Sequence, residues 1–240
     1  MTADGRRGAA PFVALLLAAV LAGPAAAAAA AAEYKTFTTT DGAVLEYALA
    51  LPEGFDAART YPVLVALPPG GQGRSMVEAG LPYFETEGVR RGYIVVSPAA
   101  PARLVFFRGG ARFIPEFLEF LSQEYNVAGG KFHLTGISNG GLSAFRAALD
   151  RPDLFHTLTV LPGFPPAPGD EALIAGLAGI TITMFAGETD TGWVTRMDKA
   201  AASMRAAGLD VHYEVVPGAG HVVRALAGAD NARMFDLIER

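Results

Sequence analysis

Ser138 stands at the centre of a Gly-x-Ser-x-Gly pentapeptide, residues 136–140 (GISNG). A β-rich segment precedes it at 131–135, and a helical pattern begins near Gly140, so the sequence predicts a sharp turn between a strand and a helix. Such a turn needs small flanking residues, and the N-terminus of the following helix stabilises negative charge. The pentapeptide alone is weak evidence, and its alternative is an ordinary Gly-rich turn. The strand and helix around it indicate a nucleophilic serine.

His221 is the histidine best placed to act as the base that such a serine needs. It follows the β-rich segment 211–216 through a Gly-rich turn at 217–220, where the sites of α/β proteins are usually built. The other three histidines lie within or at the start of predicted strands, where a packing role is commoner: His133, His156 and His212.

The acid that orients the base is predicted to be Asp190, which follows the apolar segment 180–185. The order Ser, Asp, His along the chain, with each residue in a loop after a strand, is typical of one arrangement of catalytic triad. Glu188 is the competing carboxylate, two residues closer to the strand. Asp198 falls on the next predicted helix and is expected to face outward.

Two backbone N–H groups are expected to form an oxyanion hole for the triad. One belongs to Asn139, directly after the nucleophile, and the other to the loop after the apolar segment 61–67. That loop begins Pro-Pro-Gly-Gly, and proline has no N–H, so the donor is predicted to be Gly70 or Gly71, with Gly70 preferred. The alternative is a plain Pro-Gly turn.

Strand and helix patterns alternate along the chain, which predicts an α/β fold with a mostly parallel sheet covered by helices on both faces. The expected strands are 35–39, 44–51, 61–67, 93–97, 131–135, 157–161, 180–185 and 211–216. The expected helices are 112–125, 140–149, 193–207 and 231–238. No repeat or linker divides the chain, so residues 33–240 are predicted to form one domain.

Residues 1–32 have the pattern of a secretory signal peptide. Arg6 and Arg7 precede an eleven-residue apolar run, 12–22, and an alanine-rich stretch follows it. The sequence therefore predicts cleavage before Glu33 and a protein that is secreted or periplasmic, without stable membrane insertion afterwards. A retained N-terminal anchor is the alternative.

Composition excludes several other classes of protein. Of the 240 residues 51% are hydrophobic and 18% charged, so a disordered chain is not expected. There is no cysteine, which excludes disulfides and Cys-ligated metal sites. The formal net charge of −5 argues against nucleic acid as a partner.

With these residues, the chain resembles the α/β-hydrolases, and within them the esterase branch that includes polyhydroxyalkanoate depolymerases and feruloyl esterases. The resemblance spans about 44–223 and is most specific over 113–142, where a helix, a short turn and the strand lead into Gly-x-Ser-Asn-Gly-Gly. That branch normally carries His-Gly at the start of the oxyanion loop, where this chain has Pro68 and Pro69.

The resemblance implies a roughly eight-stranded sheet and an ester hydrolase in which Ser138 is acylated with the help of His221 and Asp190. It implies no metal and no organic cofactor. Only residues 162–179 separate the strands predicted at 157–161 and 180–185, so no large cap domain is expected there and the site should be open. Small-molecule and polymer-borne esters are both expected substrates, and the oligomeric state is left open. A prolyl-oligopeptidase-like serine peptidase and a non-catalytic binding protein on the same scaffold are the alternatives.

Four aromatic residues fall in predicted loops or at helix starts near strand ends. Trp193, Phe107 and Phe164 are predicted to line the substrate pocket, Trp193 most of all, and Phe106 is a further candidate. Local packing is the alternative for each of them.

Overall fold

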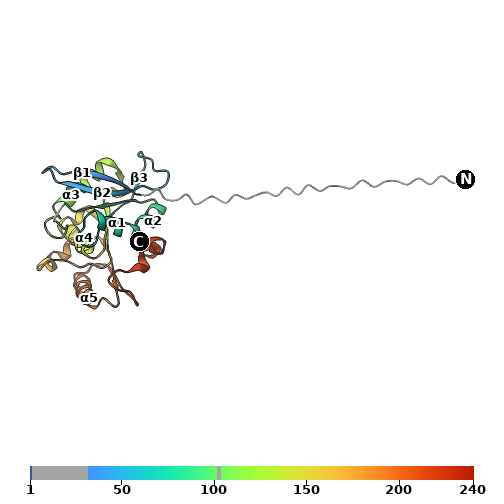
Figure 1. Cartoon of the computed structure of the whole chain (residues 1–240). Helices are drawn as coiled ribbons and strands as arrows, with labels where there is room; N and C mark the ends of the chain where they lie inside the picture. Colours follow the sequence, from blue (N-terminus) through green and yellow to red (C-terminus); the bar gives the residue numbers. More distant parts are fainter. Residues whose placement is uncertain (2–31, 102–103) are drawn as a thin grey trace.

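The computed structural model describes Met1 and residues 32–101 and 104–240, so the predicted signal peptide lies almost wholly outside the described residues. Eight strands form one sheet in the order β1-β2-β5-β4-β7-β8-β9-β10. Their bounds are β1 Glu33–Thr38, β2 Val44–Ala50, β4 Val63–Leu67, β5 Ile94–Pro98, β7 Phe132–Gly136, β8 Phe155–Val160, β9 Thr181–Gly187 and β10 Val211–Val216. β1 and β2 lie at one end of the molecule and helix α5 (Thr191–Ala206) at the other (Figure 1).

The sheet is mostly parallel. β2 runs antiparallel to both β1 and β5, whereas every pairing from β5 through β10 is parallel. The predicted α/β class and the eight-stranded sheet are therefore confirmed. Since parallel strands end at the same edge, the loops that follow β4, β7, β9 and β10 meet at one side of the sheet.

Two separate hydrophobic clusters cover the two faces of the sheet. In β4, Val63, Val65 and Leu67 belong to one cluster, and Leu64 and Ala66 belong to the other. This alternation follows from the two-residue period of a strand, and both faces are apolar because both are covered.

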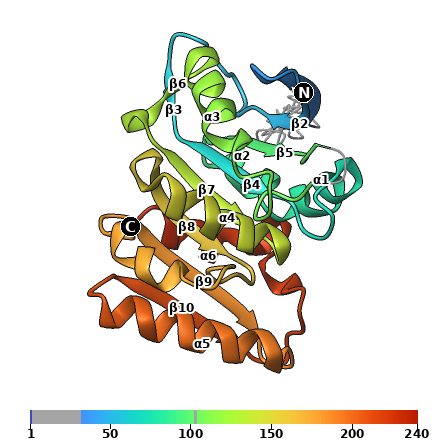
Figure 2. The same cartoon turned by 90° about the vertical axis from the view of Figure 1, so that its left-hand side faces the viewer.

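The helices divide between the same two faces. Helices α3 (Phe113–Glu124), α4 (Asn139–Asp150) and α5 contribute to the first cluster. Helices α1 (Arg74–Gly80), α2 (Glu85–Arg90) and α6 (Ala232–Ile238) contribute to the second. Figure 2 shows α4 lying along β7 and β8, which it contacts. Among the described helices, none is both long and apolar enough to cross a bilayer.

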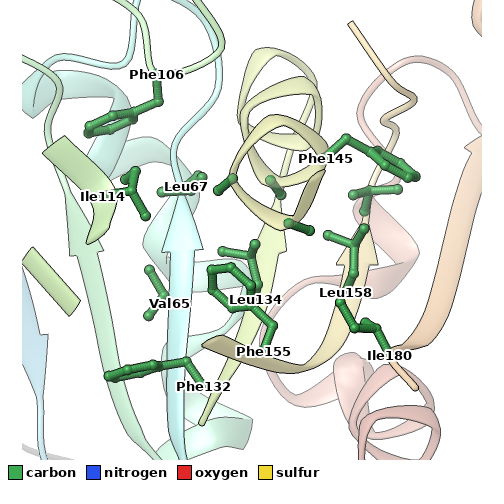
Figure 3. Close-up of a cluster of buried hydrophobic side chains, with 14 of the residues drawn as sticks. Val65, Leu67, Phe106, Ile114, Phe132, Leu134, Phe145, Phe155, Leu158 and Ile180 are labelled. Carbon is green, nitrogen blue, oxygen red and sulfur yellow. The ribbon is translucent and has the colours of Figure 1, made fainter. Parts of the chain in front are cut away.

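The centre of the first cluster joins three neighbouring strands, β4, β7 and β8. Val65 of β4 is in register with Leu134 of β7, which is in register with Leu158 of β8, and all three are fully buried (Figure 3). Burying a side chain of this size contributes about 1.5–3 kcal/mol. The close packing holds the ends of these strands, and the loops that follow them, in fixed positions.

Most predicted elements differ from the structure by a few residues at their ends, and two of these differences have a clear local cause or consequence. The strand predicted at 61–67 is divided at Pro62: a short β3 (Thr60–Tyr61) pairs with β6 (Asn126–Val127), and β4 begins at Val63. Pro62 has no N–H to donate to a ladder, which explains the division. The helix predicted at 193–207 begins at Thr191, so Asp190 lies directly at its start.

Candidate active site

Ser138 occupies the tight turn between β7 and α4. Its φ of 58° and ψ of −117° lie outside the regions that non-glycine residues normally adopt. A backbone held there costs about 1–3 kcal/mol, and such strain is concentrated at functional positions. The turn also needs its two glycines, because a Cβ on Gly136 would lie 2.2 Å from the carbonyl oxygen of Gly140, and one on Gly140 would lie 2.0 Å from that of Leu67. The N–H of Ser138 donates to the carbonyl of Pro162 (3.0 Å), which ties the turn to the loop after β8.

The three residues predicted to form a triad are joined by a continuous chain of hydrogen bonds. Ser138 Oγ lies 2.8 Å from Nε2 of His221, and Nδ1 of His221 lies 2.5 Å from Oδ2 of Asp190. The imidazole therefore reaches the serine with one nitrogen and the carboxylate with the other. The side chain of His221 is 39% exposed and that of Asp190 is 19% exposed, so the chain opens to solvent at its imidazole.

Asp190 is also the N-cap residue of α5, where an aspartate side chain usually accepts hydrogen bonds from the first N–H groups of the helix. Here the side chain makes no capping bond. The N–H groups of Trp193 and Val194 are instead accepted by the main-chain carbonyl of Asp190, each at 3.0 Å. The carboxylate is thereby left for His221.

Glu188, the competing acid, has a different partner. Its Oε2 accepts the N–H of Gly218 (2.8 Å), which lies in the turn that carries His221. The N–H and the hydroxyl of Thr189 both donate to the carbonyl of Ala219 in that turn, at 3.0 Å each. Residues 188–189 thus fasten the histidine loop to the acid loop, while Asp190 alone of the two carboxylates meets the imidazole.

The other histidines have structural surroundings. His133 lies within β7, where its Nδ1 is 3.0 Å from the hydroxyl of Thr157. Burial, with a smaller contribution from His156, lowers the pKa of His133 to about 4, so its imidazole is neutral at pH 7. His156 is exposed at the second residue of β8, and His212 lies on the edge strand β10. Asp198 is exposed, as expected.

The predicted oxyanion loop lies against the nucleophile turn. Nδ2 of Asn139 donates to the carbonyl oxygen of Gly70 (2.8 Å), and the loop turns sharply because the N–H of Gln72 donates to the carbonyl of Pro69 (3.0 Å). The backbone N–H groups of Gly70 and Asn139 meet no acceptor among the residues that the structure describes. Gly71, the second predicted donor, is the more exposed of the two glycines.

Gln72 organises this loop, although no pattern in the sequence predicts a role for it. It is fully buried with a positive φ of 58°. Its Nε2 donates to the carbonyl of Pro68 (2.9 Å) and lies 3.0 Å from Oγ of Ser143, and its Oε1 accepts the N–H of Phe106 (2.6 Å). The hydroxyl of Ser143 in turn lies 2.8 Å from the carbonyl of Asn139. The only signal in the sequence is a long polar residue within a loop of glycines and prolines.

One predicted pocket residue, Trp193, lies beside the imidazole, and a second, Phe164, packs against Trp193. The ring centroids of Trp193 and His221 are 5.0 Å apart, and those of Phe164 and Trp193 are also 5.0 Å apart. Phe107 is half-buried with the guanidinium of Arg108 5.7 Å from its ring. Phe106 is fully buried in the first hydrophobic cluster, so local packing describes it better than a pocket role.

No protein-family model matches the chain. Solved structures do match it, including a thermostable esterase with a TM-score of 0.72 at 18% identity over 87% of this chain and 62% of the esterase. A ferulic acid esterase matches with a TM-score of 0.65 at 18% identity, over 86% of this chain and 96% of that protein. The chain has the α/β-hydrolase fold. The α/β-hydrolase fold is shared with peptidases: dipeptidyl peptidase 4 of Porphyromonas gingivalis matches with a TM-score of 0.64 at 14% identity, over 87% of this chain.

The chain spans less than two thirds of the thermostable esterase and 35% of the peptidase. Between β8 and β9, residues 161–180 form a loop and one short 3-10 helix, η4 (Asp170–Leu177). The prediction that no large cap is inserted into the hydrolase fold is confirmed at this position. The hydrogen-bonded chain of Ser138, His221 and Asp190 is consequently open to solvent above the sheet edge.

Proposed function

We propose that the protein is a serine hydrolase that cleaves carboxylic esters. The observation that carries this proposal is the unbroken contact from Ser138 through His221 to Asp190, built on a strained turn at the carboxyl edge of the sheet. Each residue has the partner that its role requires, and the alternative carboxylate, Glu188, is engaged elsewhere.

In the acylation step, Oγ of Ser138 attacks the ester carbonyl carbon while Nε2 of His221 accepts the hydroxyl proton. The Nδ1–H of the imidazole donates to Asp190, whose negative charge stabilises the imidazolium that forms. When the tetrahedral intermediate collapses, the bond between the carbonyl carbon and the alcohol oxygen breaks, and His221 gives its proton to the departing alcohol. The acid part remains as an ester of Ser138.

In the deacylation step, His221 removes a proton from water, and the hydroxide oxygen attacks the acyl carbon. The proton then returns to Oγ as the acid leaves. In both steps the carbonyl oxygen becomes negative, and the N–H groups of Gly70 and Asn139 are the proposed donors to it. The N-terminus of α4, directly behind Ser138, adds favourable electrostatic potential.

The ester preference is supported by the esterases among the structural neighbours and by the resemblance of 113–142 to esterases. The open site suits both small esters and ester groups carried on a polymer. Because the same triad serves peptidases, the test must compare esters with amides.

The purified mature protein, its Ser138→Ala variant and a control, Ser122→Ala, should be incubated with a fluorophosphonate probe and with short p-nitrophenyl esters. Ser122 donates to the carbonyl of Leu118 within α3, away from the candidate site. Labelling and ester turnover in the parent and in the control, with neither in Ser138→Ala, supports the proposal. Labelling with turnover of peptides alone supports a peptidase instead, and no labelling supports a non-catalytic protein.

We further propose that residues 1–32 direct export and are removed. Cleavage takes the formal net charge from −5 to −6, because Asp4, Arg6 and Arg7 depart. N-terminal sequencing of the protein recovered from a periplasmic or culture fraction is expected to begin near Glu33. A product that keeps Met1 and stays in the cytoplasm contradicts this proposal.

A further inference from the structure

A line of contacts leads from the imidazole to a surface cation. Trp193 packs on His221, Phe164 packs on Trp193, and the guanidinium of Arg196 lies 5.6 Å from the ring centroid of Phe164. Trp193 and Arg196 are three residues apart on α5, so they lie on the same side of that helix. The line is thus an aromatic wall with a positive charge at its far end.

A hollow of about 190 Å³ lies at that far end, between α5 and the segment that follows β8. Phe164 and Ile174 supply apolar walls, and Arg196 and Lys199 lie on its α5 side. Phe164 therefore belongs both to the hollow and to the aromatic wall beside the triad. The contacts from His221 through Trp193 and Phe164 thus end at Arg196, on the lining of the hollow.

The charges around the hollow are paired except for one. Nζ of Lys199 lies 2.7 Å from Glu171, and the carboxylate of Asp170 lies 2.6 Å from Arg146. Among the described side chains, Arg196 has no carboxylate partner. A guanidinium presents two parallel N–H groups that match a carboxylate, and an exposed one without a partner is ready to bind it.

We propose that this hollow is an anion subsite, in which Arg196 binds a carboxylate carried by the ester substrate at the end of an extended apolar spacer. The spacer lies along Trp193 and Phe164, and the scissile ester lies at Ser138. Half-esters of dicarboxylic acids and acyl esters of hydroxy acids belong to this class. The inference rests on the proposed ester hydrolase function and names its substrate class.

The preference for an anionic ester must arise from Arg196 itself, because the protein as a whole is negatively charged and repels anions. It is expected to appear in KM more than in kcat, since a contact far from the reacting carbonyl binds the ground state and the transition state alike. A charge-assisted contact of this kind corresponds to about a ten-fold preference.

The test compares kcat and KM for p-nitrophenyl half-esters of dicarboxylic acids of increasing length with those of neutral alkanoates of the same length. A second series places the carboxylate on the alcohol side, as acetyl esters of hydroxy acids. In at least one series, an optimum length is expected at which the anionic ester has about a ten-fold lower KM than the neutral one.

Arg196→Gln should abolish that difference, and Arg196→Lys should retain part of it, because the charge remains without the planar fork. Lys199→Gln is the matched control: it removes the same charge from the same helix, yet Lys199 is already paired with Glu171. The anion preference should survive in Lys199→Gln.

The inference is overturned if the parent shows no anion preference at any length in either series, or if Arg196→Gln and Lys199→Gln change KM equally. Neutral p-nitrophenyl esters and fluorophosphonate labelling report on the triad alone. If they fail in the parent, the proposed function fails; if they succeed while the anion preference is absent, only the subsite is refuted.

Discussion

Gln72 connects three parts of the site through a single amide group. It joins the oxyanion loop at Pro68, the backbone at Phe106 and, through Ser143, the first turn of α4. A buried amide with these partners is costly to replace, because each group left without a partner loses about 1–3 kcal/mol. The carbonyl of Pro68, at the start of the loop that carries Gly70, is held by this amide. We infer that Gln72 is a positioning residue for the oxyanion donors.

Gln72→Glu is expected to lower kcat by about 10- to 100-fold with little change in KM, since losing one oxyanion donor outright costs about 10²–10³ in kcat. The carboxylate still accepts from Phe106 but has no N–H to donate to Pro68. Steady-state kinetics on a neutral ester measure the effects on kcat and on KM separately. Ser143→Ala serves as a milder comparison. A fall in melting temperature with unchanged kcat in the folded fraction shows a purely structural role.

Loop position predicts which polar residues meet at the candidate site, but it does not predict the residue whose bonds depend on distant partners. Ser138, Asp190 and His221 each follow a recognisable strand, so the topology brings them to one edge. The bonds of Gln72 join residues 34 and 71 positions away, and no local pattern predicts such contacts. The resulting four-residue contact network becomes visible only when the loops are placed in three dimensions.

At the scale of elements, the loops after β9 and β10 act as one unit. Glu188 holds Gly218, Thr189 holds Ala219, and Asp190 holds His221. Gly187 allows the loops to approach, since a Cβ there would lie 2.0 Å from the carbonyl oxygen of Gly220. Two carboxylates two residues apart thus have separate tasks, one on the backbone of the histidine loop and one on its imidazole.

Asp190→Asn and Glu188→Gln separate these tasks. Asp190→Asn is expected to lower kcat by about 10⁴-fold, as an amide favours the wrong imidazole tautomer. Glu188→Gln keeps an oxygen that accepts from Gly218 and is expected to change kcat by less than about ten-fold, in keeping with a net loss near 1 kcal/mol for one hydrogen bond. Kinetics of both variants against the same ester provide the measurement. The reverse order of effects assigns the acid role to Glu188.

The elements themselves were largely predictable because apolar runs and turn residues are local. The strand order was not: β5 lies between β2 and β4, and no local sequence pattern specifies which strands are neighbours. Element ends also moved where one residue decided them, as at Pro62, which divides β3 from β4. Helix α5 begins at Thr191, so Asp190 is both its N-cap residue and the partner of His221. The position of the acid and the start of the helix therefore depend on each other.

At the scale of the whole molecule, stability is coupled to pH through groups remote from the site. Glu87, buried in α2, is bonded to Arg90 and Arg91, and these arginines lower the pKa of its carboxyl. Arg91 also reaches Asp236 and Glu239 near the C-terminus, so it ties α2 to α6. Because the pKa of Glu87 is lowered in the fold, its ion pairs stabilise the folded protein fully above the ordinary glutamate pKa. This stabilisation is lost as the pH falls from that value through the lowered pKa.

His133 makes the fold sensitive to pH in a higher range. Burial lowers its pKa from 6.5 to about 4, so between these values the unfolded chain binds a proton that the folded chain does not, and stability falls as the pH falls. The full shift corresponds to about 3 kcal/mol. Urea unfolding at pH 7.5 and pH 5 should show a smaller pH-dependent loss in His133→Leu than in the parent, although the variant starts about 1 kcal/mol lower because Thr157 loses its partner. His156→Gln removes only the minor cause of the shift and should keep most of the loss. If the parent and His133→Leu lose the same unfolding free energy between pH 7.5 and pH 5, His133 takes up its proton in the folded protein as well, and its surroundings in β7 admit water.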